Sequence, residues 1–178
     1  MRAYVTLLST RSYLDGVLVL NYSLKKVQSK YPLICLLSQG IEDDVLMKLR
    51  QAGIEYILLD SKVYDGVLDT NCKSSNWDFS SWNYTFDKLY IWGLTQFEKI
   101  VFIDSDMVVF KNLDHLFERK DFTASLAGVL FPTNHNIRIL NSGLMVLTPS
   151  KDIEKSLVEL AGDIISNMHA KGLPVGDQ

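Results

Sequence analysis

The chain has 178 residues, of which 47% are hydrophobic and 22% are charged, and its formal net charge is −3. These values predict one globular domain with a buried core and exclude a disordered or fibrous chain. The negative charge argues against a protein that coats nucleic acid or an acidic membrane surface. No apolar run approaches the roughly 20 residues of a membrane span, and no signal-peptide pattern opens the chain, so we expect a cytoplasmic location.

Short apolar runs alternate with helical patterns in the first 59 residues. The runs that predict strands are 4–9, 33–37 and 56–59. After the first run, apolar residues recur every three or four positions and predict a helix with one buried stripe: Val17, Leu20, Leu24 and Val27. After the second run, acidic residues at 42–44 and Gly53 indicate where another helix begins and ends. This alternation predicts an α/β fold with a mostly parallel sheet.

Regular patterns return after a polar stretch at 60–83. The spacing predicts a helix over 85–96, a strand over 100–103 and another strand over 140–147. Residues 148–150 then read as the cap of a last helix. Its predicted core-facing stripe is Ile153, Leu157, Leu160, Ile164 and Met168.

Two carboxylates follow directly after the apolar run at 100–103, in the sequence Asp104-Ser105-Asp106. Ligands of open α/β sheets bind beyond the carboxyl ends of strands. Alternation along an extended chain would point Asp104 and Asp106 to the same side. Two such carboxylates can hold a hard divalent cation, whereas burying them side by side without one would be costly. We therefore predict a metal site made by Asp104 and Asp106.

The same residues also fit a different enzyme class. Asp104-Ser105-Asp106-Met107-Val108 matches the nucleophile motif of haloacid-dehalogenase-like phosphatases, in which the first Asp attacks phosphorus and the second is an acid/base. That family carries its motif on the opening strand. Here three strand–helix units come first, which makes the phosphatase the less favoured alternative.

Seven short motifs spread over the whole chain carry a family resemblance. In chain order they are Val5–Tyr13, Gly16–Leu24, Phe86–Trp92, Lys99–Asp106, Asn112–Phe117, Asn141–Val146 and Gly176–Gln178. In this order and spacing they resemble glycosyltransferase family 8, the family of glycogenin and the galactinol synthases. No single motif is specific, but the combination is.

The resemblance implies one GT-A domain over residues 1–178, a Rossmann-like nucleotide-sugar-binding fold whose C-terminal part is missing from this chain. It implies a retaining glycosyltransferase that moves a hexose or pentose from a UDP-sugar. Mn²⁺ is the implied cofactor, with Mg²⁺ as the alternative. The acceptor is a carbohydrate, a lipid or a protein, nucleic acid is not a partner, and a homodimer is one assembly compatible with the family.

Position by position, the resemblance implies a nucleotide site and a metal pair. The residues that would hold uracil and ribose are Leu7, Ser9, Thr10 and Tyr13. Asp104 and Asp106 would bind the metal, with the Ser105 backbone near the ribose.

The resemblance also implies a catalytic sugar site. Lys88 would reach the diphosphate or the sugar, Asn141 and Ser142 would line the donor sugar, and Asp177 and Gln178 would face the reacting sugar. The family's third metal ligand is a His in a motif downstream of Gln178, so this chain ends before it. The remaining alternative is therefore a fragment that binds UDP-sugar without turning it over.

Overall fold

The computed structural model describes residues 1–59, 80–127 and 139–170. Its elements in chain order are β1 (Arg2–Leu8), η1 (Arg11–Tyr13), α1 (Leu14–Lys26), β2 (Leu33–Leu37), α2 (Asp43–Gln51), β3 (Glu55–Leu58), η3 (Ser80–Gly93), β4 (Lys99–Ile103), η4 (Asp114–Glu118), β5 (Thr123–Leu126), β6 (Leu140–Leu147) and α3 (Lys151–Ala170). None of the helices in these ranges is long and apolar enough to cross a membrane.

The six strands form one sheet in the order β3-β2-β1-β4-β6-β5. Strands β1 to β4 run parallel to one another, and β6 runs antiparallel to both β4 and β5. Parallel neighbours need long crossovers, which α1 and α2 supply. The predicted α/β fold with a mostly parallel sheet is confirmed. The short edge strand β5 was not predicted.

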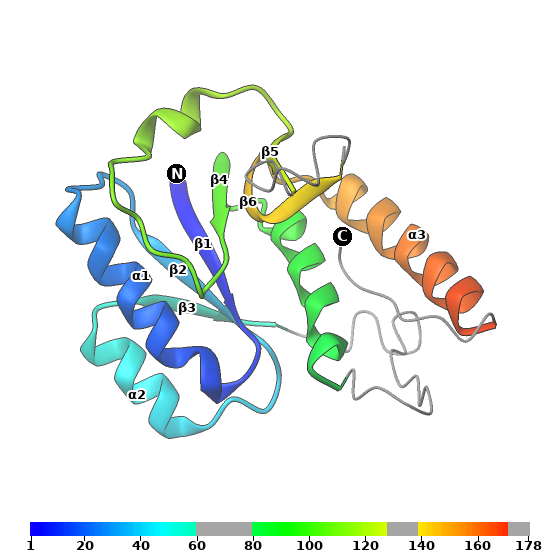
Figure 1. Cartoon of the computed structure of the whole chain (residues 1–178), viewed down its shortest axis with the longest axis horizontal. Coiled ribbons are helices and arrows are strands. Elements are labelled where there is room, and N and C mark those ends of the chain that lie inside the picture. Colours follow the sequence, from blue (N-terminus) through cyan, green and yellow to red (C-terminus); the bar gives the residue numbers. More distant parts are fainter. Residues whose placement is uncertain (60–79, 128–138, 171–178) are drawn as a thin grey trace.

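Helices cover both faces of the sheet (Figure 1), with α1 and α2 on one side and η3 and α3 on the other. Side chains of β1 alternate between the two layers. Val5 and Leu7 pack in a cluster with Ile91 of η3, whereas Tyr4 packs in a cluster with Leu20 of α1. The strands of a parallel sheet that is covered on both faces are apolar along almost their whole length. Strands β2 and β4 show this pattern.

Asp114 of η4 joins several segments near the amino ends of the strands. It accepts hydrogen bonds from the Tyr4 hydroxyl at 2.9 Å, the Ser29 hydroxyl at 2.8 Å, the Lys30 main-chain N–H at 3.0 Å and the Asn112 amide at 3.1 Å. Burial acts to raise the pKa of Asp114, but these hydrogen bonds outweigh it and lower the pKa below its usual value. The motif 112–117 therefore has a structural role.

The predicted core-facing stripe of the last helix is wrong. Ile153, Leu160 and Ile164, three of its five members, are 47%, 55% and 46% exposed. The helix instead buries Glu154 and Ala161, which face η3. Periodicity showed that α3 has one apolar stripe, but the neighbouring helix, which no local pattern predicts, decides which face is covered.

Candidate active site

Three neighbouring parallel strands end side by side at one edge of the sheet, since β1 pairs with both β2 and β4. The first residues beyond their ends are Ser9, Ser38 and Asp104. The Asp104 main-chain N–H still donates to the Gly143 carbonyl on β6 at 2.9 Å. Two of the polar residues predicted for the site, Ser9 and Asp104, thus lie where the regular sheet ends.

A turn separates the two carboxylates that were predicted to bind metal. The Met107 N–H donates to the Asp104 carbonyl at 3.2 Å and closes this turn directly after β4. The prediction that extended alternation would orient Asp104 and Asp106 is therefore wrong. Asp104 is half-buried, Ser105 between them is buried, and Asp106 is exposed.

Lys88 of η3 lies against Asp104. Its ammonium is 3.0 Å from Asp104 Oδ1, donates to Ser142 Oγ at 3.1 Å, and lies 5.3 Å from the centre of the Phe102 ring. Lys88 is only 8% exposed. A cation buried this far needs an anionic partner. The structure therefore brings together three predicted site residues: Lys88 of η3, Asp104 directly after β4, and Ser142 of β6.

Because Gly143 of β6 has no side chain, oxygen atoms of Asp104 and Asn141 occupy the space beside it. A β-carbon at this position would stand 3.0 Å from Asp104 Oδ2 and 2.8 Å from Asn141 Oδ1. The Gly143 N–H donates to the same Asn141 oxygen at 2.7 Å. Carboxylate and amide oxygens are hard donors of the kind that Mg²⁺ and Mn²⁺ prefer. The oxygens of Asp104 and Asn141 beside Gly143 are therefore of the chemical kind that such a cation binds.

The loop after β1 holds the residues predicted to bind the nucleotide. Ser9 and Thr10 are half-buried, and the Tyr13 ring is 44% exposed at the start of α1. Arg11 anchors this loop to the beginning of α2, through Glu42 at 2.7 Å and through Asp44. An exposed ring on an anchored loop suits stacking on a base.

Leu7, the fourth residue predicted at the nucleotide, is only 8% exposed and packs in the core beneath η3. Its side chain is therefore committed to the interior. Only the main chain of Leu7 can contact a ligand at the sheet edge.

Sequence reasoning missed Asp87 and Ser38. Ser38, directly after β2, donates a hydrogen bond to Asp87, which precedes Lys88 on η3. Burial raises the pKa of Asp87, and the hydrogen bond from Ser38 opposes that rise. The contact ties η3 to the carboxyl edge of the sheet. The sequence signal was that Asp87 directly precedes Lys88. This signal does not identify Ser38 as the partner of Asp87.

Asp177 and Gln178, predicted to face the reacting sugar, lie outside the described residues. Within 1–59, 80–127 and 139–170, no group of three or more His, Cys, Asp or Glu side chains is placed to hold a metal ion. Among His, Cys, Asp and Glu, the described part of the site therefore supplies two candidate carboxylates, Asp104 and Asp106, and no third ligand placed with them.

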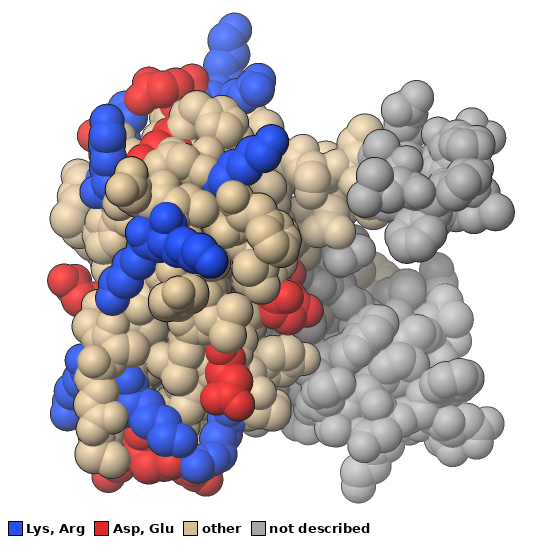
Figure 2. Space-filling model, turned by 60° about the vertical axis from the view of Figure 1, so that its left-hand side comes forward, with Lys and Arg blue, Asp and Glu red and all other residues tan. Residues whose placement is uncertain are grey.

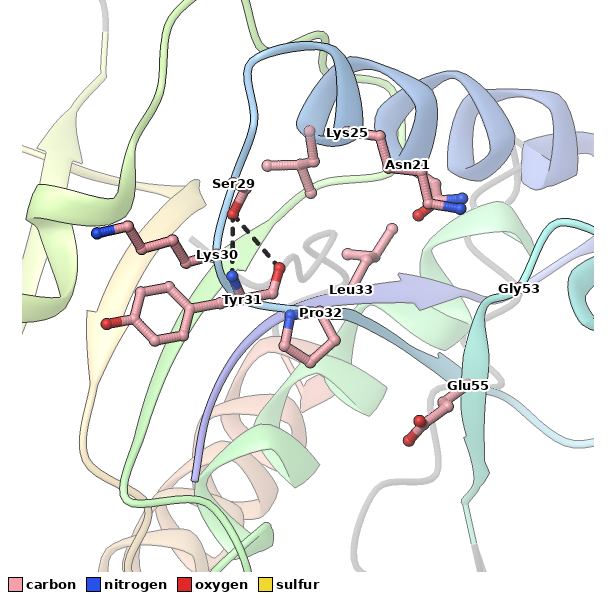
Figure 3. Close-up of a pocket in the computed structure, with 10 residues that line it drawn as sticks. Asn21, Lys25, Ser29, Lys30, Tyr31, Pro32, Leu33, Gly53 and Glu55 are labelled. Carbon is pink, nitrogen blue, oxygen red and sulfur yellow. Dashed lines mark hydrogen bonds between the residues drawn. The ribbon is translucent and has the colours of Figure 1, made fainter.

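A pocket of about 340 Å³ lies at the opposite edge, where β2 and β3 begin (Figure 3). Two of its polar side chains, Asn21 and Lys25, both donate to the Ala52 carbonyl. On the face that Figure 2 shows, basic and acidic side chains are mixed in small groups. Neither this pocket nor this charged face is favoured over the strand-end cluster as the candidate active site.

The sheet order and the polar residues at the strand ends define a Rossmann-like α/β protein, a class whose ligands bind at the carboxyl edge of the sheet. The family model for glycosyl transferase family 8 matches residues 4–178. The chain therefore belongs to glycosyltransferase family 8. The haloacid-dehalogenase alternative receives no support from the comparisons with known proteins.

Two curated relatives illustrate the similarity. The chain is 32% identical over 165 residues to UDP-glucuronate:xylan alpha-glucuronosyltransferase 2 of Arabidopsis thaliana, covering 92% of this chain and 25% of that protein. It is 31% identical over 164 residues to glycogenin-1 of Homo sapiens, covering 91% and 43%. The chain thus spans less than half the length of either relative.

Solved structures show the fold. The apo-form glycosyltransferase GlyE of Streptococcus pneumoniae has a TM-score of 0.65 at 19% identity, over 99% of this chain and 41% of that chain. The galactosyltransferase LgtC, solved with donor and acceptor sugar analogs, has a TM-score of 0.59 at 16% identity, over 97% and 63%. The predicted GT-A fold is confirmed.

Proposed function

We propose that the complete gene product is a retaining glycosyltransferase that moves a hexose or pentose from a UDP-sugar to an acceptor. The observation that carries this proposal is the cluster at the strand ends. Lys88 pairs with Asp104 at 3.0 Å, and the oxygens of Asp104 and Asn141 share the space beside Gly143. The membership in family 8 supports the same conclusion.

Asp104 and Asp106 would hold a divalent cation, Mn²⁺ or Mg²⁺, which supplies Lewis-acid stabilisation of the departing UDP. The oxygen donors beside Gly143 fit such an ion. GT-A glycosyltransferases generally use a divalent metal, and the choice of Mn²⁺ follows from the family resemblance. The cytoplasmic location stays a prediction of the sequence.

The nucleotide would lie over the ends of β1 and β4. Tyr13 would stack on uracil, while Ser9, Thr10 and the main chain of Leu7 would contact the base and ribose. The Ser105 main chain would lie near the ribose, as the family resemblance implies. Because Arg11 anchors this loop to the beginning of α2, the loop would already be in position before the nucleotide binds.

The donor sugar would lie between η3 and β6. Lys88 would contact the diphosphate or sugar, and its charge would stabilise the negative charge that develops as UDP leaves. Asn141 and Ser142 would contact sugar hydroxyls, with Asp177 and Gln178 facing the reacting carbon. The acceptor hydroxyl would attack C1 on the face from which UDP departs. The C1–O bond to phosphate breaks, the new C1–O bond forms, and a departing phosphate oxygen takes the acceptor proton.

The test is release of UDP from UDP-glucose, UDP-galactose, UDP-xylose and UDP-N-acetylglucosamine, with Mn²⁺ and with EDTA. We expect metal-dependent release from one donor and its loss in Asp106→Asn. Release of phosphate from a generic phosphomonoester would instead favour the phosphatase. Metal-dependent UDP binding without turnover of any donor would identify a binding protein.

A further inference from the structure

The segment from Asp104 to Val109 carries both candidate metal ligands, and it leaves the sheet at the turn after β4. Its main-chain path beyond Asp104 must therefore be set by something other than strand pairing. Helix α1 contacts this segment at two places. Both contacts come from residues of the motif Gly16–Leu24, whose role the proposed function leaves unexplained.

The first contact is between Gly16 and the residue that separates the two carboxylates. A β-carbon on Gly16 would stand 2.3 Å from the Ser105 carbonyl oxygen, 3.2 Å from its carbonyl carbon and 3.7 Å from the Asp106 nitrogen. Gly16 lies within α1, and any larger residue at this position would collide with the Ser105 carbonyl. Ser105 is itself buried, so its carbonyl has little room to move away from α1.

The second contact is a hydrogen bond at the far end of the segment. Ser23 Oγ accepts from the Val109 main-chain N–H at 3.1 Å and donates to the Leu20 carbonyl at 2.8 Å. Ser23 and Val109 are 4% and 7% exposed. No water competes for a donor and acceptor buried this deeply, so the bond fixes where the segment re-enters the core.

Gly16 and Ser23 are seven residues apart, which is about two helical turns, so both lie on the same face of α1. We propose that α1 acts as a template for the metal-binding segment, with Gly16 and Ser23 as positioning residues for Asp104 and Asp106. This inference rests on the proposed metal site. It also links that site to the nucleotide loop, because Tyr13 directly precedes α1.

The test uses Gly16→Ala in the complete gene product, with Tyr22→Ala, a 65% exposed position on the same helix, as the matched control. Ala would favour the helix, yet the Ser105 carbonyl would have to move by about 1 Å to restore ordinary contact. Calorimetry would measure binding of UDP with Mn²⁺, of UDP with EDTA, and of uridine. Thermal unfolding would measure stability.

We expect Gly16→Ala to weaken metal-dependent UDP binding about tenfold and to lower the melting temperature by a few degrees, with uridine binding close to wild type. Ser23→Ala should act in the same direction, because it leaves the buried Val109 N–H without its acceptor. If Gly16→Ala does not fold, Ser23→Ala decides the question by the same affinities. The control should leave all affinities unchanged.

Two results would overturn the template role. Gly16→Ala and Ser23→Ala could both bind UDP with Mn²⁺ as wild type does, or they could lose uridine and UDP equally. Failure of the proposed function looks different, because wild-type UDP affinity would then be the same in EDTA and in Mn²⁺. That outcome would remove the metal site and this inference together.

Discussion

Replacing Lys88 by Met tests the centre of the site. Met retains most of the length and the apolar packing over Phe102, and it removes the charge that pairs with Asp104 at 3.0 Å. The Asp104 side chain is 34% exposed, so water can solvate the carboxylate that Lys88 leaves. We therefore expect the free energy of unfolding to fall by only about 1–2 kcal/mol.

Binding should respond more strongly than stability. A hydrogen bond between charged groups contributes about 1.5–3 kcal/mol, so losing the Lys88 contact to the diphosphate should weaken UDP binding about 10- to 150-fold. Uridine has no phosphate and should bind as before. Mn²⁺ alone should bind at least as tightly, because a positive charge next to Asp104 has been removed.

Calorimetry with UDP, uridine and Mn²⁺ measures these three affinities. Lys99→Met is the matched control, because Lys99 is another largely buried lysine, 15% exposed and 3.3 Å from Asp121, at the opposite end of β4. It should lower stability without changing any affinity. Equal losses of UDP and uridine binding in Lys88→Met, or weaker binding of Mn²⁺ alone, would refute the assignment of Lys88 to the diphosphate.

Asp106→Asn should abolish the metal dependence of UDP binding while the fold is retained, and equal UDP affinity of wild type in EDTA and Mn²⁺ would contradict the metal site. Tyr13→Ala should weaken uridine and UDP alike, by about 1–2 kcal/mol as stacking is lost; an effect on UDP alone would place the ring elsewhere. Asp114→Asn should lower stability at pH 7 by about 1–3 kcal/mol. Because the folded-state pKa of Asp114 is lowered, its contribution is present above the usual pKa of about 3.9 and is lost as the pH falls below that value. Chemical unfolding from pH 7 to pH 3 should therefore show the difference from wild type shrinking with acidity; a constant difference would show that ionisation of Asp114 contributes nothing.

Local patterns were enough to predict most of the architecture. The stripe of α1, the acidic start of α2 and the glycine after it all depend on main-chain geometry within one or two turns. The hydrophobic runs of the strands and their alternation with helical patterns are also local features, and they predicted the parallel sheet. The position of Asp104 beyond β4 also followed from the sequence, since a strand ends where its apolar run ends.

Contacts between distant segments could not be predicted in this way. The exposed stripe of α3 depends on how that helix packs on η3, where Glu154 occupies the space beside Gly93. The pairing of Asp87 with Ser38 joins residues 49 positions apart. The sequence by itself determined most of the elements, the family motifs and most of the candidate residues, because these depend on the spacing of residues close together in the chain. Tertiary structure alone decided that Lys88 is buried against Asp104 and that Gly16 must be small, because each depends on atoms from distant segments that only folding brings together.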